Sequence, residues 1–209
     1  MSATEPPIRQ ARGDATRRQI LDAAERVFAD IGYAAARLDH VAELVGIRRP
    51  SIIYHFPGKQ QLYDEVEADI FASMHRFVLD RTDGLTDPME RLLALLDAWL
   101  DFLVSRPTAA RIIQRLIADS AAVGDNPVRF SETALEDMED VVAAGVASGQ
   151  FQPVSGMILL NTVAAGSLHY VCNAHQLGPN RSYDPADPSQ LAEYRAMMHR
   201  LAKAAVSPG

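Results

Sequence analysis

The chain has 209 residues, 48% of them hydrophobic and 22% charged, which is ordinary for a folded globular protein and excludes a disordered one. Its net charge of −7 argues against unspecific coating of a polyanion. The single Cys excludes a disulfide scaffold or a Cys-rich zinc module and fits a reducing, cytoplasmic setting. Residues 1–13 contain no apolar run, so no secretory signal is expected.

The N-terminal quarter differs in charge from the rest of the chain. From Arg9 to Lys59 there are nine Lys and Arg against six Asp and Glu, so this segment is basic although the whole chain is acidic. A basic segment on an acidic chain is typical of a patch that meets an anion, although an ordinary solvated face explains it as well. Arg9 and Arg12 could enter a minor groove, but a solvated tail is the favoured interpretation.

Apolar residues recur at helical spacing along the chain, and strand signals are nearly absent. A first helix has an apolar stripe from Ile20 to Ile31 and should end at Gly32. A short second helix should stop at Gly46, and a third should run from about Arg48 to His55. Pro50 fits there because it falls in the first turn, where its missing N–H costs nothing.

The rest of the chain predicts further helices separated by Pro- and Gly-containing breaks. They are expected to begin after Pro57-Gly58 and at Pro88, Pro107, Asn126-Pro127, Val154 and Pro188. The prediction is therefore an all-α fold of about nine helices. We expect a disordered arm over 1–13, an N-terminal three-helix helix-turn-helix domain over 14–60 and a C-terminal helical domain over 61–209.

The segment 38–56 has the build of a helix-turn-helix, with the motif extending over about 37–56. Ala42 is the small residue needed where two helices cross, and Gly46 tolerates the positive φ of the turn. The outward residues at the start of the second helix, the end that enters a major groove, are Arg48, Arg49, Pro50 and Ser51. On composition alone, two ordinary helices with a solvated Arg pair fit equally well.

The sequence around this motif resembles the N-terminal domain of the tetracycline-repressor (TetR) family. The matching stretches fall within about fifty consecutive positions: 16–33, Val41-Ala42, Val45-Gly46-Ile47, Ile53 to Lys59, and Leu62. The C-terminal two thirds agrees in length and helical pattern. The resemblance implies a homodimeric transcription factor on double-stranded DNA, usually a repressor released by a small molecule. A TetR-like activator is the alternative.

The resemblance also implies which side chains meet DNA. Arg49, Pro50 and Ser51 fall where the family contacts base edges, and Tyr54, His55 and Lys59 fall where it grips phosphates. Two departures concern the helix starts. Ala35-Ala36-Arg37 replaces the usual capping Thr or Ser, so Arg37 is expected to take over the phosphate contact. Arg48-Arg49-Pro50 replaces the common Ser-x-Gly, which brings Arg48 into the expected DNA-contacting set.

No Asp, Glu, Lys or Arg occurs between Asp140 and Arg181. Gly and polar residues interrupt this stretch, so it predicts a helix buried on more than one face and no membrane span. The resemblance implies that this helix and the last one form a four-helix dimer interface. The residues expected there are Ala164, Ala165, Leu168, Tyr194, Met198 and Leu201.

Effector contacts are expected on helices that surround the family's ligand pocket. The candidates are apolar, aromatic or polar residues within apolar helices: Phe71, Met74, Phe77, Trp99, Phe102, Met138, Asn161 and His169. They favour an amphipathic or aromatic ligand, although a plain core explains the apolar members as well.

Three alternatives are a metal- or redox-responsive regulator, an enzyme and a protein–protein adaptor. An adaptor would not need the outward pair Arg48 and Arg49. His169, Cys172 and His175 would suit a metal- or redox-responsive regulator only if a dimer shared the site, because the third is turned about 120° from the first on one helix. No cofactor is therefore expected. An enzyme is disfavoured because Gly-rich phosphate loops and hydrolase motifs do not occur.

Overall fold

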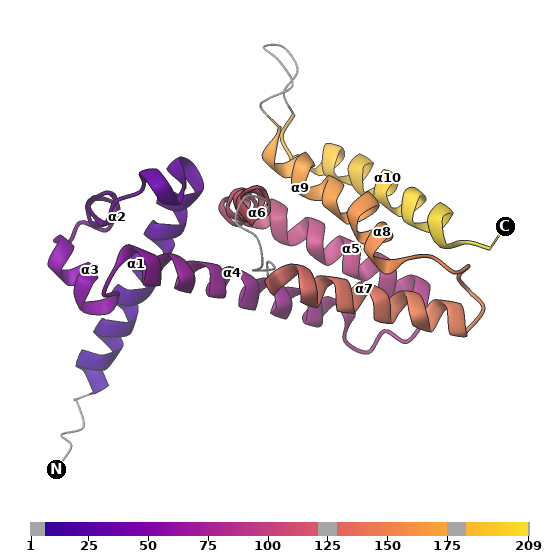
Figure 1. Ribbon diagram of the computed structural model, residues 1–209, viewed down its shortest axis with the longest axis horizontal. Coiled ribbons are helices and arrows are strands. Elements are labelled where there is room, and N and C mark those ends of the chain that lie inside the picture. The colour runs from indigo at the N-terminus through magenta and orange to yellow at the C-terminus, as the bar shows by residue number, and fades with distance from the viewer. Residues whose placement is uncertain (1–6, 121–128, 175–182, 209) are drawn as a thin grey trace. The chain divides into compact units, whose positions relative to one another are not determined.

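The computed structural model describes residues 7–120, 129–174 and 183–208, and every regular element in these ranges is a helix (Figure 1). The chain divides into two compact units, Met1–Phe71 and Ala72–Gly209. The predicted all-α fold with an N-terminal helix-turn-helix is confirmed.

The N-terminal unit consists of α1 (Pro7–Ala35), α2 (Leu38–Val45), α3 (Arg49–His55) and the first turns of α4 (Lys59–Thr82). Because α1 begins at Pro7, residues 7–13 are helical and not part of a disordered arm, while residues 1–6 lie outside the described ranges. Gly32, with φ 75° and ψ 165°, interrupts α1 where the sequence predicts its end.

The core of this unit joins all four of its helices. Ile20 and Phe28 from the apolar stripe of α1 are fully buried with Ile52 of α3, Phe56 and Leu62. This burial supplies the apolar free energy that holds the short helices α2 and α3, which are too short to be stable alone.

The C-terminal unit contains the end of α4 and the remaining helices: α5 (Pro88–Ser105), α6 (Pro107–Ser120), α7 (Arg129–Ala147), α8 (Gly156–Leu159), η1 (Leu160–Ala164), α9 (Ala165–Cys172) and α10 (Pro188–Val206). The elements α8, η1 and α9 form one continuous helix, because Leu160 and Ala164 keep α-helical φ and ψ. Its middle, η1, is a π-helical turn, which the sequence did not predict.

Helix α5 lies at the centre of the C-terminal unit and packs against α6, α7, α9 and α10. Its side chains Leu92, Leu96 and Leu100 are fully buried. The helix starts at Pro88 as predicted, and the Asp87 carboxylate accepts a hydrogen bond from the Glu90 N–H as its cap. No helix in the described ranges is both long and apolar enough to cross a bilayer.

Candidate functional site

A tight turn sets α3 against α2. Gly46 adopts the left-handed conformation with φ 75° and ψ 30° and ends α2, as the sequence predicts. The N–H groups of Gly46 and Ile47 both donate to the Ala42 carbonyl, at 2.9 and 3.0 Å. Ala42 is buried at the crossing and Ile52 packs α3 back onto the core. Together these contacts build a helix-turn-helix.

The outward face of α3 carries most of the residues predicted to meet DNA. Arg48, Arg49, Pro50 and Ser51 are exposed at its start, and Tyr54 is 81% exposed further along. The Tyr54 ring meets the half-buried His55 ring edge to face at 5.1 Å. The geometry thus leaves an arginine pair, a hydroxyl and a phenol open on one short helix, a set able to bind base edges and phosphates.

An ion pair lies beside this face. The Arg49 guanidinium is 3.7 Å from the Asp39 carboxylate in the first turn of α2, and both side chains are more than half exposed. A pair so exposed contributes little to stability. Arg37 precedes α2 as an exposed residue without a side-chain cap bond, so this helix start lacks the cap that the usual Thr or Ser supplies.

Lys59, which is predicted to grip a phosphate, bonds to the backbone of its own chain. Its ammonium group donates to the carbonyl oxygens of Tyr33, Ala34 and Ala36, at 2.8, 3.4 and 3.1 Å. An ammonium group has three N–H donors, so these bonds can occupy all of them. In this structure, Lys59 ties the start of α4 to the segment between α1 and α2.

Ile53 is a further exposed residue of α3 that the sequence pattern did not single out. Its side chain is 43% exposed and stands one helical turn after Arg49, next to Tyr54. The spacing of four residues from Arg49 was the available signal, because residues at i and i+4 share a helix face. An exposed branched aliphatic group at this place can contact a thymine methyl group.

The residues predicted for effector binding separate into core and surface. Met74, Phe102 and Met138 are buried, and the half-buried Trp99 indole donates to the Ala164 carbonyl at 2.8 Å. The remaining candidates divide as follows: Phe71 is half-buried in the N-terminal unit, Phe77 is half-buried 6.0 Å from the Phe102 ring, and Asn161 and His169 are exposed. The Asn161 amide donates to the Met157 carbonyl of its own helix at 2.8 Å.

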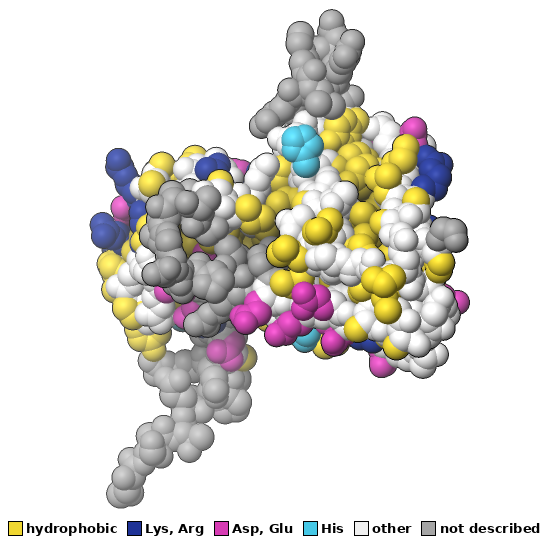
Figure 2. Space-filling model, turned by 45° about the vertical axis from the view of Figure 1, so that its right-hand side comes forward, with side chains coloured by type: hydrophobic (Ala, Val, Ile, Leu, Met, Phe, Trp, Pro, Cys, Tyr) yellow, Lys and Arg dark blue, Asp and Glu magenta, His cyan; other side chains and the backbone are white. Residues whose placement is uncertain are grey.

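The residues predicted for a dimer interface divide in the same way. Ala164, Leu168 and Met198 are buried within the chain itself, and the half-buried Tyr194 stacks on the Tyr170 ring at 4.1 Å. Ala165 and Leu201 are exposed. The large apolar side chains exposed on α8 and α10 are Met157, Ile158, Met197 and Leu201. Hydrophobic side chains cover much of one face of this unit in Figure 2.

The possible metal or redox group is only partly within the described ranges. His169 lies 2.5 Å from the Asn173 amide nitrogen, and Cys172 is half-buried. Burial raises the pKa of the Cys172 thiol, although nearby Arg111 acts in the opposite direction. His175 lies outside the described residues, and among those described no three His, Cys, Asp or Glu side chains could hold a metal ion.

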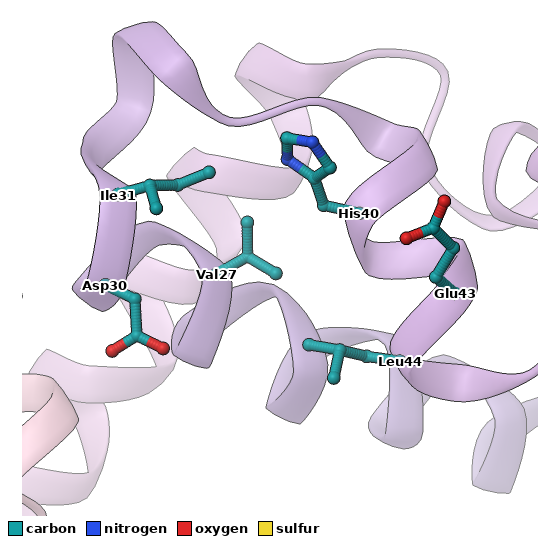
Figure 3. Close-up of a pocket in the computed structure, with 6 residues that line it drawn as sticks. All are labelled: Val27, Asp30, Ile31, His40, Glu43 and Leu44. Carbon is teal, nitrogen blue, oxygen red and sulfur yellow. The ribbon is translucent and has the colours of Figure 1, made fainter.

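An open hollow of about 300 Å³ lies between α1 and α2 (Figure 3). It is lined by Val27, Asp30, Ile31, His40, Glu43 and Leu44. The buried Nδ1 of His40 has no hydrogen-bond partner among the described residues. None of the residues predicted for effector binding lines this hollow, so it does not correspond to the predicted effector site.

Comparisons with known proteins match both units. Residues 20–66 match the model of the bacterial regulatory proteins of the tetR family, and residues 88–201 match that of the tetracyclin repressor-like C-terminal domain. The chain is 26% identical over 208 residues to the HTH-type transcriptional repressor NicS of Pseudomonas putida, covering 97% of each chain.

Two further similarities concern a protein called KstR2. The HTH-type transcriptional repressor KstR2 of Mycolicibacterium smegmatis is 30% identical over 142 residues, which are 66% of this chain and 68% of the relative. The structure of the ketosteroid transcriptional regulator KstR2 of Mycobacterium tuberculosis superposes with a TM-score of 0.72 at 20% identity, covering 92% of this chain and 95% of the other.

Proposed function

Since the chain belongs to the TetR family of bacterial transcriptional regulators, we propose that it acts as a homodimeric repressor on a pseudo-palindromic operator and leaves it when a small effector binds. The relatives named above are transcriptional regulators and not enzymes. The proposed DNA contacts are the predicted ones: the exposed Arg37, Arg48, Arg49, Pro50, Ser51 and Tyr54, the half-buried His55, and Lys59.

The observation that carries this proposal is the division of α3 into two faces. Ile52 is fully buried, while Arg49, Ile53 and Tyr54 are exposed around it. A helix held by its inner face in this way presents fixed side chains to a major groove. Arginine can form a bidentate pair with a guanine edge, so Arg49 is the proposed principal base contact.

The homodimer is proposed from the apolar side chains that are exposed on α8 and α10. Met157, Ile158 and Leu201 remain exposed there, and an apolar patch of several side chains is typical of a protein interface. Two-fold symmetry would place two copies of α3 on two operator half-sites, about one helical turn of DNA or a multiple of it apart.

The proposed effector is a small amphipathic or aromatic molecule. The support is the aromatic content near α5, where the Phe77 and Phe102 rings lie 6.0 Å apart in the C-terminal unit. The KstR2 structure from Mycobacterium tuberculosis, which shares this fold, is described as a ketosteroid regulator. The effector should release DNA, and DNA should weaken effector binding by the same factor.

The test is fluorescence anisotropy of the purified protein on labelled DNA from upstream of its own gene, titrated at two salt concentrations. We expect sequence-preferring binding that weakens steeply with salt. Arg49→Ala should cost about 1–3 kcal/mol and relax specificity at one base pair. The control is Arg76→Ala, which removes an exposed arginine of the C-terminal unit.

If the upstream DNA shows no preference, selection from a random DNA pool separates an operator located elsewhere from an absence of recognition. A pool that yields no enriched sequence would contradict the proposed function. Wild-type affinity of Arg49→Ala for the enriched sequence would instead contradict only the residue assignment.

A further inference from the structure

Two carboxylates on α5 connect α4 with α10. Asp97 and Asp101 are one helical turn apart, and their side chains are only 23% and 22% exposed. Arg81, in the last turn of α4, donates to one oxygen of Asp101 at 2.7 Å. Arg195 of α10 bonds to the other oxygen of Asp101 and lies 2.7 Å from Asp97. His199 of α10 lies 2.8 Å from Asp97.

The ion pairs of Arg195 are less exposed than an ordinary surface ion pair, with 26% of its side chain exposed, while Arg81 is 44% exposed. Two like charges one turn apart on a helix repel each other. The arginines Arg81 and Arg195 offset this repulsion between Asp97 and Asp101. Arg195 is bound by both carboxylates, and such charge-assisted pairs have fixed geometry. Burial lowers the pKa of Arg195, but its hydrogen bonds with Asp101 and Asp97 outweigh this and raise it.

The same turn of α4 is also held by aromatic contacts. The Arg81 guanidinium lies 4.7 Å from the centroid of the Phe77 ring, which in turn lies 6.0 Å from the Phe102 ring of α5. Helix α4 runs without interruption from Lys59 to Thr82, so its first turns belong to the N-terminal unit and its last turns to the C-terminal unit. The contacts of its last turn therefore act on a helix whose first turns lie in the N-terminal unit.

From these contacts we infer that Asp101 is a positioning residue for DNA binding. It joins Arg81 to Arg195 and so makes the placement of the last turn of α4 depend on α10. The inference rests on the proposed function, in which α10 belongs to the dimer interface and the N-terminal unit binds the operator. The arrangement held by Asp101 is the one that binds DNA, because a loosened α4 spreads the two recognition helices over many separations.

The test compares four variants for operator affinity, melting temperature and amide hydrogen exchange of residues 76–82. Asp101→Asn removes the charge, and Asp101→Glu keeps it. Asp80→Asn removes an exposed carboxylate beside Arg81 that takes no part in these ion pairs. Leu100→Ala removes a fully buried core side chain of α5 and lowers stability without touching the ion pairs.

We expect Asp101→Asn to weaken operator binding by about 10-fold, which corresponds to about 1.4 kcal/mol, and to speed amide exchange in 76–82. Asp101→Glu should restore most of the affinity, and Asp80→Asn should bind like the wild type. Leu100→Ala should lower the melting temperature while the folded protein keeps its affinity.

Three results would overturn the inference. The first two are unchanged or tighter operator binding by Asp101→Asn. The third is an equal loss of affinity in Leu100→Ala when both variants melt at the same temperature. If the wild type itself binds no specific DNA, the proposed function fails. The hydrogen-exchange comparison then still decides whether Asp101 holds the last turn of α4.

Discussion

The ammonium nitrogen of Lys59 lies 2.8 Å from the Tyr33 carbonyl oxygen and 4.3 Å from the centroid of the Tyr33 ring. The Tyr33 phenol donates a hydrogen bond to the side-chain oxygen of Gln60 at 2.7 Å. Tyr33 follows Gly32, where α1 is interrupted. The side chains of Tyr33 and Lys59 therefore hold this end of α1 against the start of α4. Lys59 therefore has a structural task in this fold whether or not it also approaches a phosphate.

Replacing Lys59 should lower stability. In Lys59→Met the carbonyls of Tyr33 and Ala36 lose a charged donor, and we expect the free energy of unfolding to fall by about 1–3 kcal/mol. Thermal and urea unfolding measure this. The control is Lys203→Met, which changes the chain's only other lysine at an exposed position of α10. A Lys59→Met protein that unfolds like the wild type but binds all DNA sequences more weakly would restore the phosphate role as the main one.

Ile53 should make the protein sensitive to a single methyl group of the operator. Replacing the contacted thymine by uracil removes only the C5-methyl, so the wild type should bind about 4-fold more weakly, which corresponds to about 0.8 kcal/mol for one buried methyl-sized group. Ile53→Ala should bind the two duplexes alike. Anisotropy with thymine-to-uracil duplexes, one position at a time, gives the answer; equal losses in both proteins at every position would exclude this contact.

A charge on the apolar face should separate the subunits of the proposed dimer. Ile158 is 59% exposed, and Ile158→Glu would bury a carboxylate in the interface. We expect sedimentation equilibrium to show a monomer at micromolar concentration with the helical circular-dichroism signal retained. Leu79→Glu, at an apolar residue of α4 that is similarly exposed, is the matched control. A dimeric Ile158→Glu protein would place the interface elsewhere.

Asp137 should make stability depend on pH. Burial raises the pKa of its carboxyl and Asp140 adds to this, against the opposing effects of His75 and Arg91. The folded state therefore binds the proton more tightly than the unfolded state. The resulting stabilisation is complete below the ordinary aspartate pKa of about 3.9 and is lost as the pH rises through the higher pKa of the folded state.

The corresponding variant is Asp137→Asn. It should melt at a higher temperature than the wild type at pH 7, and the difference should shrink as the pH approaches 4. Glu136→Gln changes the exposed neighbouring carboxylate and should have little effect at either pH. A variant less stable than the wild type at pH 7 would show that His75 and Arg91 outweigh burial.

Much of the fold could be predicted because local rules decide it. Pro88, Pro107 and Pro188 begin helices since proline fits the first turn, and Gly46 ends one since its left-handed conformation costs glycine little. The π-helical turn could not be predicted in this way. It involves a contact between distant parts of the chain, the hydrogen bond from Trp99 to the Ala164 carbonyl.

The candidate site was predicted less completely. Spacing placed Arg49 and Tyr54 on an exposed helix, but it could not show that Lys59 is engaged by carbonyls more than twenty residues earlier. When a helix packs on two sides, the sequence does not show whether an apolar residue on it faces the core of its own chain or a second subunit. For this reason Ala164 and Met198 were expected at a surface between subunits, whereas the chain buries them in its own core.

The π-helical turn Leu160–Ala164 has a consequence for the face around it. Met157, Asn161, Ala165 and His169 are all exposed, at steps of four residues. In a regular α-helix each such step drifts by about 40°, so the row would wind about 120° round the axis. The wider turn absorbs part of this drift and keeps the row straighter. Deleting one residue there, for example Thr162, would place the row at i, i+4, i+7 and i+11, which a regular α-helix keeps on one face. The wider turn therefore accommodates one extra residue in the helix without turning this face away.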